Sequence, residues 1–422
     1  MKHVSSFFLV LLFISTNTFS QADFRQEYQK AMSAYDSGDY SSFMTGLEKT
    51  NSLRPNHRIV LYNLAIAYVL NDMPEKALST LEYRASFYNV PDFQEDEDFK
   101  PLRELKGYKN LVQAIEKRSN ALSNSEFLFE FEDRGFHPEG IAMHQEFETI
   151  FLSDVRCGLL KTVSFEGKEK EDFMDLKEEG FWGALGMKID PLDNNVLWIV
   201  TSVLPQFCEY SEEINGRSAL LKVDINKKEI TESYTVEGNH IFGDLTISEE
   251  GDVFISDSNE PMIYSLKRGT KKIEPFLTSD QFFNLQGLDF GKNGYLYVSD
   301  YITGIYKIKL SDLSVNPLMD SDNQILRGTD GMYYANGNLV LLQNGTNPIK
   351  VSIIKLDESG NATAKSLKIL DSNTSFLNEP TLGAILNNKL YFVSNSPWSY
   401  YEDNVPMLDK WPSLQIRTLL VE

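Results

Sequence analysis

The sequence predicts a mainly β fold preceded by a small α-helical domain, and three observations support this. A short motif recurs six times within residues 138–382, each time before a β-rich segment. Toward the N-terminus the apolar residues instead lie three or four positions apart, the spacing of a helix. The period changes to two at Phe127, Phe129 and Phe131. We therefore expect two regions that meet between residues 119 and 125.

Residues 1–20 have the features of a secretory signal peptide. Lys2 precedes an apolar run from Phe7 to Ile14, and small residues stand three and one positions before Gln21. This apolar run is too short to be a membrane span, and no other long apolar run follows it. We expect an exported protein, periplasmic or secreted, without a membrane span.

The composition is acidic. Removal of the signal peptide takes only Lys2 from the 40 basic residues, which leaves 39 against 61 acidic ones, or a net charge of −22. Such a surface repels nucleic-acid backbones and anionic membranes, so no nucleic-acid partner is expected. In an oxidising compartment Cys157 and Cys208 could form a disulfide between adjacent loops. The sequence leaves open this bridge or two unpaired thiols.

Residues 21–119 are expected to form a helical domain of two hairpins. Their predicted turns are Ser37–Asp39 and Asn71–Pro74. Ala34-Tyr35 recurs as Ala67-Tyr68, close to the roughly 34-residue period of tetratricopeptide repeats, which this region resembles. We interpret it as a docking or stabilising appendage that could bind a protein partner, with a dedicated peptide-binding groove as the alternative.

Residues 126–422 are expected to form a six-bladed β-propeller. In each motif copy a polar and a small residue precede an apolar run, a turn, and a strand that ends in Ser, Asp or Asn. The second motif positions lie 46, 59, 42, 44 and 50 residues apart, close to the roughly 40 to 50 residues of a four-stranded blade. These positions are Gly140, Gly186, Leu245, Gly287, Gly331 and Thr381.

The ring is expected to close through its two ends. Glu126–Phe131 alternates in the way of a strand with one buried face, and Leu414–Val421 is also strand-like. Propellers commonly pair one terminus with the other. We therefore predict that Glu126–Phe131 is the outer strand of the last blade.

Polar residues precede the innermost strand of five blades. Because these strands line the central channel, the five side chains should converge on its mouth. Converging carboxylate and amide oxygens suit Ca²⁺, Mg²⁺ or Mn²⁺, although such residues also cap strands and bind structural water. The five are Glu139, Asp244, Gln286, Asp330 and Glu379.

Other residues offer less chemistry. With five histidines and two cysteines in the chain, a thiolate or multi-histidine zinc site is not expected. His137 and His240 precede two mouth segments and are each a site or a structural residue. Trp182, Trp198 and Trp398 are assigned to core packing rather than to stacking on a ligand. No G-x-S-x-G motif supports Ser-His-Asp catalysis.

Segments in all six blades, among them HPEGIA, LGMKIDP, GDVFISDS, YLYVSDY, GTDGMYY and NEPTLG, resemble those of one family. The propeller is similar to the senescence-marker-protein/gluconolactonase family of calcium-dependent sugar lactonases. This resemblance implies that Glu139, Gln286 and Asp330 hold a divalent cation, with Ca²⁺ expected and Mg²⁺ or Mn²⁺ as alternatives. It also makes Asp330 the general base. Substrate contacts are assigned to Asp244, Glu379 and His137.

Two residues depart from the family pattern. Gln286 stands where the family has an asparagine, and Gly243 stands where another asparagine contacts substrate. One hypothesis is therefore an exported metal-dependent hydrolase that opens a lactone or related ester. The alternative is a non-catalytic propeller that binds a ligand or a protein, with the helical domain as a docking surface. Glu139 and Asp330 favour the first hypothesis, whereas Gly243 and Gln286 favour the second.

Overall fold

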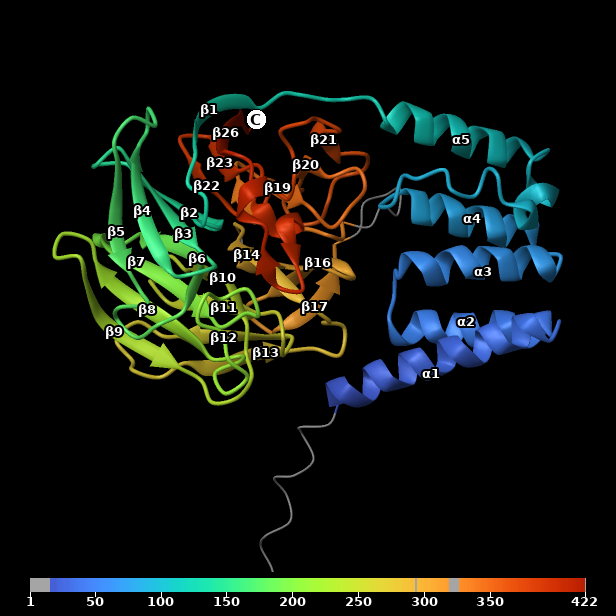
Figure 1. The fold of residues 1–422 in the computed structure, drawn as a ribbon, viewed down its shortest axis with the longest axis horizontal. Coiled ribbons are helices and arrows are strands. Elements are labelled where there is room, and N and C mark those ends of the chain that lie inside the picture. The colour runs from blue at the N-terminus through green and yellow to red at the C-terminus, as the bar shows by residue number, and fades with distance from the viewer. Residues whose placement is uncertain (1–15, 293, 319–325, 422) are drawn as a thin grey trace, which may run out of the picture. The chain divides into compact units, whose positions relative to one another are not determined.

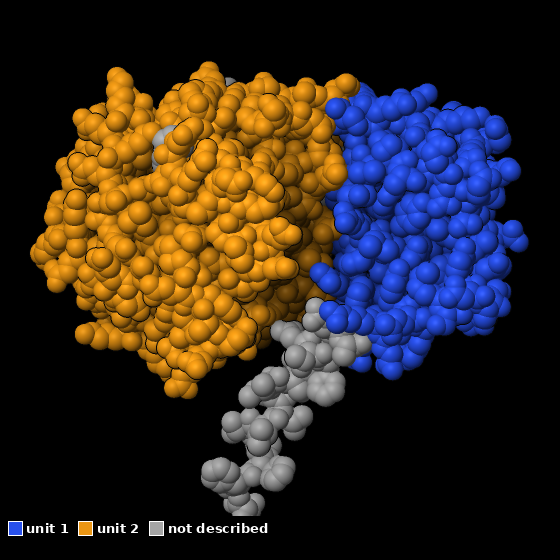
Figure 2. All heavy atoms as spheres, in the orientation of Figure 1, with its two compact units in different colours: residues 1–119 blue, residues 120–422 orange. Residues whose placement is uncertain are grey.

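The structure is a computed structural model that describes residues 16–292, 294–318 and 326–421 (Figure 1). Most of the predicted signal peptide, residues 1–15, lies outside the described residues. The chain divides into two compact units, residues 1–119 and 120–422 (Figure 2). No helix in the described ranges is long and apolar enough to cross a membrane.

The first unit is helical. Asp39 begins α2 by accepting a hydrogen bond from the backbone N–H of Ser42 at 3.1 Å, and Pro74 occupies the first turn of α4. Phe43, Leu81 and Phe99 are fully buried at the centre of its core. The two predicted hairpins are therefore present, while the tetratricopeptide assignment stays a prediction. The helices are α1 (Thr16–Asp36), α2 (Tyr40–Leu53), α3 (Arg58–Leu70), α4 (Pro74–Ala85), η1 (Glu97–Leu102) and α5 (Lys106–Arg118).

The second unit is a six-bladed β-propeller, as predicted. Within the described residues it contains six four-stranded antiparallel sheets, or blades, numbered here along the chain. Blade 1 consists of β2 (Pro138–His144), β3 (Thr149–Asp154), β4 (Leu159–Ser164) and β5 (Lys170–Asp175). Blade 2 consists of β6 (Gly183–Asp190), β7 (Asp193–Ser202), β8 (Ser218–Asp224) and β9 (Glu229–Thr235). Blade 3 consists of β10 (Phe242–Ile247), β11 (Val253–Asp257), β12 (Met262–Leu266) and β13 (Glu274–Thr278).

Blades 4 to 6 complete the ring, and the last of them combines both ends of the unit. Blade 4 consists of β14 (Leu285–Phe290), β15 (Tyr295–Asp300), β16 (Gly304–Lys309) and β17 (Ser314–Pro317). Blade 5 consists of β18 (Met332–Ala335), β19 (Asn338–Gln343), β20 (Lys350–Lys355) and β21 (Lys368–Ser372). Blade 6 consists of β22 (Gly383–Leu386), β23 (Lys389–Val393), β26 (Leu414–Leu420) and β1 (Glu126–Phe131).

The predicted closure is confirmed. Strand β1 is the outer strand of blade 6 and pairs antiparallel with β26, from Glu126 opposite Thr418 to Phe131 opposite Leu414. The predicted burial of one face is wrong in one detail, because a register shift lies between Phe127 and Phe129. Phe129 is buried, whereas the side chain of Phe127 is 52% exposed.

The Ser-Asp pairs at the ends of second strands explain much of the repeat. In blade 3, Oδ1 of Asp257 accepts hydrogen bonds from the backbone N–H of Ile241, just before the innermost strand, and of Asn259 and Glu260, just after the second strand. Asp154 and Asp300 make the same type of contacts in blades 1 and 4. The carboxylate therefore fixes the chain where it enters the mouth.

A disulfide joins blades 1 and 2. Cys157 follows β3 and Cys208 follows β7, and their α-carbons are 5.3 Å apart. The structure therefore pairs the two cysteines that the sequence left open.

Candidate functional site

The five predicted mouth residues lie at the starts of innermost strands. Glu139, Asp244 and Gln286 are early residues of β2, β10 and β14, whereas Asp330 and Glu379 precede β18 and β22. Glu139 and Asp244 are only 6% and 7% exposed. The other three side chains are half-buried. Each blade except blade 2 thus contributes one oxygen-bearing side chain to the mouth.

Four of the five residues are acids that interact electrostatically across the channel. Burial raises the pKa of Glu139 well above its ordinary value, and the charges of Asp330, Glu379 and Asp244 raise it further. Burial also raises the pKa of Asp244, to about 7, although the charge of Lys188 lowers it. The structure therefore brings together four carboxyl groups from four different blades, where mutual repulsion disfavours full ionisation.

Asp330 has the most developed surroundings. Burial raises the pKa of Asp330 to about 6, and the charge of Glu379 also raises it. A hydrogen bond that Nδ2 of Asn344 donates to Oδ2 at 2.7 Å lowers this pKa. Tyr301 in turn donates its hydroxyl proton to Oδ1 of Asn344 at 2.9 Å. Sequence reasoning missed Asn344 and Tyr301, although Asn344 lies at the end of a repeat copy, in the segment LLQNG.

Gln286 and Gly243, the two departures from the family pattern, are neighbours. Nε2 of Gln286 donates to Oδ1 of Asn284 at 2.9 Å. A Cβ atom added to Gly243 would lie 3.4 Å from Oε1 of Gln286. This distance is an ordinary van der Waals contact, so Gln286 lies next to position 243 without excluding a side chain there.

His137 is fully buried beside the mouth with one unsatisfied nitrogen. Its Nδ1 lies 2.7 Å from the hydroxyl of Tyr401, while its Nε2 has no hydrogen-bond partner among the described residues. The ring centroid of Trp398 is 4.5 Å from that of His137. Burial lowers the pKa of His137 to about 3, and the charge of Arg156 lowers it further. The imidazole is therefore neutral near pH 7.

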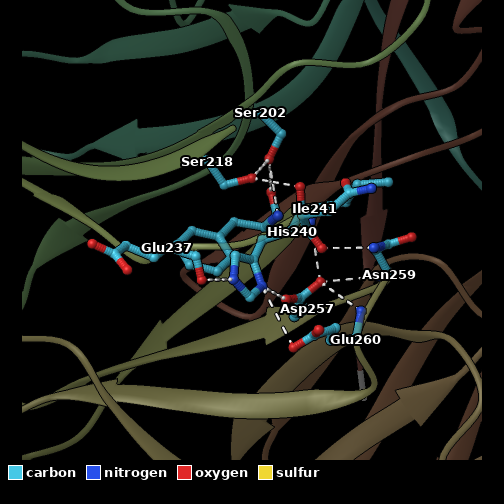
Figure 3. Close-up of polar contacts among 10 residues, drawn as sticks. Ser202, Ser218, Glu237, His240, Ile241, Asp257, Asn259 and Glu260 are labelled. Carbon is cyan, nitrogen blue, oxygen red and sulfur yellow. Dashed lines mark hydrogen bonds and ion pairs between the residues drawn. The ribbon is translucent and has the colours of Figure 1, made fainter. Parts of the chain in front are cut away.

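His240 is a structural residue instead (Figure 3). Its Nδ1 lies 2.7 Å from Oδ2 of Asp257 and its Nε2 lies 3.0 Å from the backbone oxygen of Glu237. The hydroxyl of Ser218 donates to the backbone oxygen of His240 and not to its ring. Both ring nitrogens of His240 therefore already face acceptors.

The tryptophans differ from their assignment at one position. Trp198 is buried and donates to Oδ2 of Asp190 at 3.1 Å, and Trp182 packs against the core of blades 1 and 2. Trp398, however, donates its indole N–H to Oε2 of Glu139 at 2.8 Å. The assignment of Trp398 to core packing alone is therefore incomplete.

A second polar cluster lies further along the channel strands. Nζ of Lys188 in β6 is 3.1 Å from Oδ1 of Asp289 in β14 and 3.0 Å from the hydroxyl of Thr246 in β10. Oδ2 of Asp289 accepts the backbone N–H of Tyr334 in β18 at 2.9 Å. Lys188 thus places a positive charge behind the acidic mouth, which the sequence analysis did not anticipate.

The oxygen-rich mouth has the donor chemistry that a hard divalent cation requires. In the described part of the chain, no three His, Cys, Asp or Glu side chains form a ready cluster for a metal ion. Glu139 and Asp330 each have one carboxylate oxygen hydrogen-bonded by a side chain, to Trp398 and Asn344, and Gln286 has its nitrogen bonded to Asn284. Each residue therefore retains an oxygen for a ligand.

The propeller is similar to solved structures with different activities. The PQQ-bound aldose sugar dehydrogenase of Streptomyces coelicolor is 13% identical, with 71% of this chain and 98% of that chain covered and a TM-score of 0.49. The gluconolactonase of Xanthomonas campestris is 13% identical, with 71% of this chain and 91% of that chain covered and a TM-score of 0.48. Virginiamycin B lyase from Staphylococcus aureus is 13% identical, with 70% of this chain and 88% of that chain covered and a TM-score of 0.45. These similarities do not determine an activity.

No protein-family model matches the chain, and no curated protein matches it in sequence. The class that fold and site define is thus a six-bladed propeller with a buried acidic channel mouth.

Proposed function

We propose that the protein is an exported, metal-dependent hydrolase that opens a lactone or a related ester at the channel mouth. The main support is Asp330, a half-buried carboxyl group that Asn344 orients and whose pKa is raised to about 6. A group with this pKa is ionised near pH 7 and is a stronger proton acceptor than an ordinary aspartate. The family resemblance of Glu139, Gln286 and Asp330 supplies the reaction class.

Glu139, Gln286 and Asp330 would hold the divalent cation, with Ca²⁺ expected. A bound cation supplies Lewis-acid polarisation of the substrate carbonyl and stabilises the oxyanion. Positive charge at this position would also relieve the repulsion among the buried carboxylates. None of the five mouth residues is positively charged, and the nearby Lys188 forms an ion pair with Asp289.

Asp330 would take the proton from the attacking water, while Asn344 fixes the orientation of its carboxylate. His137 has an unsatisfied Nε2 that can bond to a hydroxyl or oxygen of the substrate. Asp244 and Glu379 would orient water or substrate hydroxyl groups. The substrate class is a small lactone or ester rather than a polyanion, because the mouth is acidic.

The alternative is a non-catalytic propeller that binds a ligand or protein, with the helical unit as a docking surface. Gly243 favours this alternative, because it removes the amide that contacts substrate in the family. Gln286 favours it as well, because its side chain is longer than the asparagine that the family has at this position.

The decisive experiment is a panel of sugar and aliphatic lactones, assayed with Ca²⁺, Mg²⁺ or Mn²⁺. We expect Asp330→Asn to lower kcat/KM at least about 100-fold, because the proton acceptor is lost while the shape is kept. Asp312→Asn, at an exposed turn, is the control and should be unaffected. Hydrolysis that survives in Asp330→Asn, or its absence with every lactone and metal, would favour the non-catalytic alternative.

A further inference from the structure

Blade 6 contains an unusual connection. Residues 394–413, which we call the mouth insertion, join β23 to β26, whereas the same connection in blades 1, 3 and 4 is a short turn. The mouth insertion consists of η2 (Pro397–Tyr400), β24 (Tyr401–Glu402), β25 (Val405–Pro406) and η3 (Leu408–Lys410). A connection of this length in a compact ring suggests a functional loop.

The mouth insertion is fastened at several points. Within blade 6, Asn395 bonds to the backbone of both Ser413 and Gln415. Ser396 donates its hydroxyl to the backbone oxygen of Pro138 at 2.8 Å, next to Glu139. Asn404 accepts a hydrogen bond from Gln206 of blade 2 at 2.8 Å. The segment therefore connects blades 6, 1 and 2 with a fixed geometry.

Two side chains of the mouth insertion contact polar residues at the mouth end of blade 1. Tyr401 bonds to Nδ1 of His137, and Trp398 bonds to Oε2 of Glu139. Among the described residues, the indole N–H of Trp398 is the one donor to the carboxylate of Glu139. Trp398 is 259 residues further along the chain than Glu139.

We propose that Trp398 is a positioning residue that holds the carboxylate of Glu139 at the channel mouth and leaves Oε1 for a cation or substrate. This inference deepens the proposed function and rests on it. The physical reason is that a carboxylate on a flexible side chain binds more tightly when a second group fixes its orientation. Removal of such supporting partners commonly lowers metal affinity 10- to 100-fold.

Trp411 provides a matched control. It is also part of the mouth insertion, its ring lies 5.7 Å from that of His137, and it is 6% exposed. Its indole nitrogen, however, has no hydrogen-bond partner among the described residues. Trp398→Phe and Trp411→Phe therefore remove similar volume, but only the first removes a hydrogen bond to Glu139.

The test is calorimetric titration of the full chain with Ca²⁺ and Mn²⁺, after circular dichroism has shown that each variant folds. We expect about 10- to 100-fold weaker binding for Trp398→Phe and less than about a twofold change for Trp411→Phe. Unchanged affinity in Trp398→Phe, or equal losses in both variants, would overturn the positioning role.

A second measurement needs neither metal nor activity. The chain has four tryptophans, so its ¹⁵N spectrum has four indole signals, and Trp398→Phe identifies one of them. Glu139→Ala should shift the Trp398 signal and leave that of Trp411 in place. If the wild type binds no cation and opens no lactone, the proposed function fails. A Trp398 signal that does not respond to Glu139→Ala would instead overturn the inference itself.

Discussion

His137 and His240 both lie just before an innermost strand, in blades 1 and 3, but they stand one position apart in the repeat and their surroundings differ. Both nitrogens of His240 face acceptors, Asp257 and the backbone oxygen of Glu237. His137 bonds only through Nδ1, to Tyr401 of the mouth insertion, and its Nε2 is unsatisfied. The surrounding loops therefore decide whether both nitrogens of a histidine at this end of a blade find acceptors.

The largest expected effect concerns the structural histidine. Asp257 and His240 are 0% and 2% exposed, so loss of the imidazole leaves Oδ2 of a buried carboxylate without its ring partner. His240→Leu should lower the free energy of unfolding by about 3 to 5 kcal/mol. Urea denaturation measures this change. A loss below about 1 kcal/mol would contradict a structural role for His240.

The two histidines should also respond oppositely to pH. Burial lowers the pKa of His240, but the hydrogen bonds to Asp257 and to the backbone of Glu237, together with the charges of Asp257 and Glu260, raise it above its ordinary value of 6.5. Its stabilising contribution is thus fully present below about pH 6.5 and is lost as the pH rises through the folded pKa.

Burial lowers the pKa of His137 to about 3, so only the unfolded chain binds this proton between about pH 6.5 and 3. His137 therefore reduces stability as the pH falls through that range, by up to about 1.4 kcal/mol per pH unit. His137→Phe should lose less stability on acidification than the wild type. Equal losses of unfolding free energy in the two proteins between pH 7 and pH 4 would refute this difference.

The smallest effect is expected from the contact that distinguishes His137. Tyr401→Phe removes the hydroxyl at Nδ1 and should cost about 1 to 2 kcal/mol, because a buried nitrogen loses its partner. Tyr400→Phe is the matched control, since Tyr400 does not contact His137, and should cost less than about 0.5 kcal/mol. Equal melting temperatures for the two variants would show that the Tyr401 contact contributes nothing.

The sequence predicted the ring because its information is repeated and local. Blades 1, 3 and 4 repeat the Ser-Asp pair, and every blade repeats the motif before the innermost strand, so these repeats indicated six blades and five mouth residues. The register shift beside Phe127 was not predictable, because a one-residue shift leaves no mark in an alternating pattern.

The supporting side chains of the site were also beyond the sequence. Trp398 and Tyr401 contact residues more than 250 positions away, through a connection that the repeat does not include. Asn344 ends the second strand segment of blade 5, but its bond to Asp330 depends on the loop geometry. That Gln286 lies beside Gly243 likewise depends on which residues are neighbours in space.

The pairing of β1 with β26 has a consequence for biosynthesis. Glu126 emerges from the ribosome 292 residues before its partner Thr418, which at about 5 to 20 residues per second is a delay of about 15 to 60 s. During that interval β1, with its exposed Phe127, has no neighbouring strand, and the mouth insertion has not been synthesised. The nascent chain can therefore complete its first five blades early, but it acquires Trp398 beside Glu139 only with the final strand.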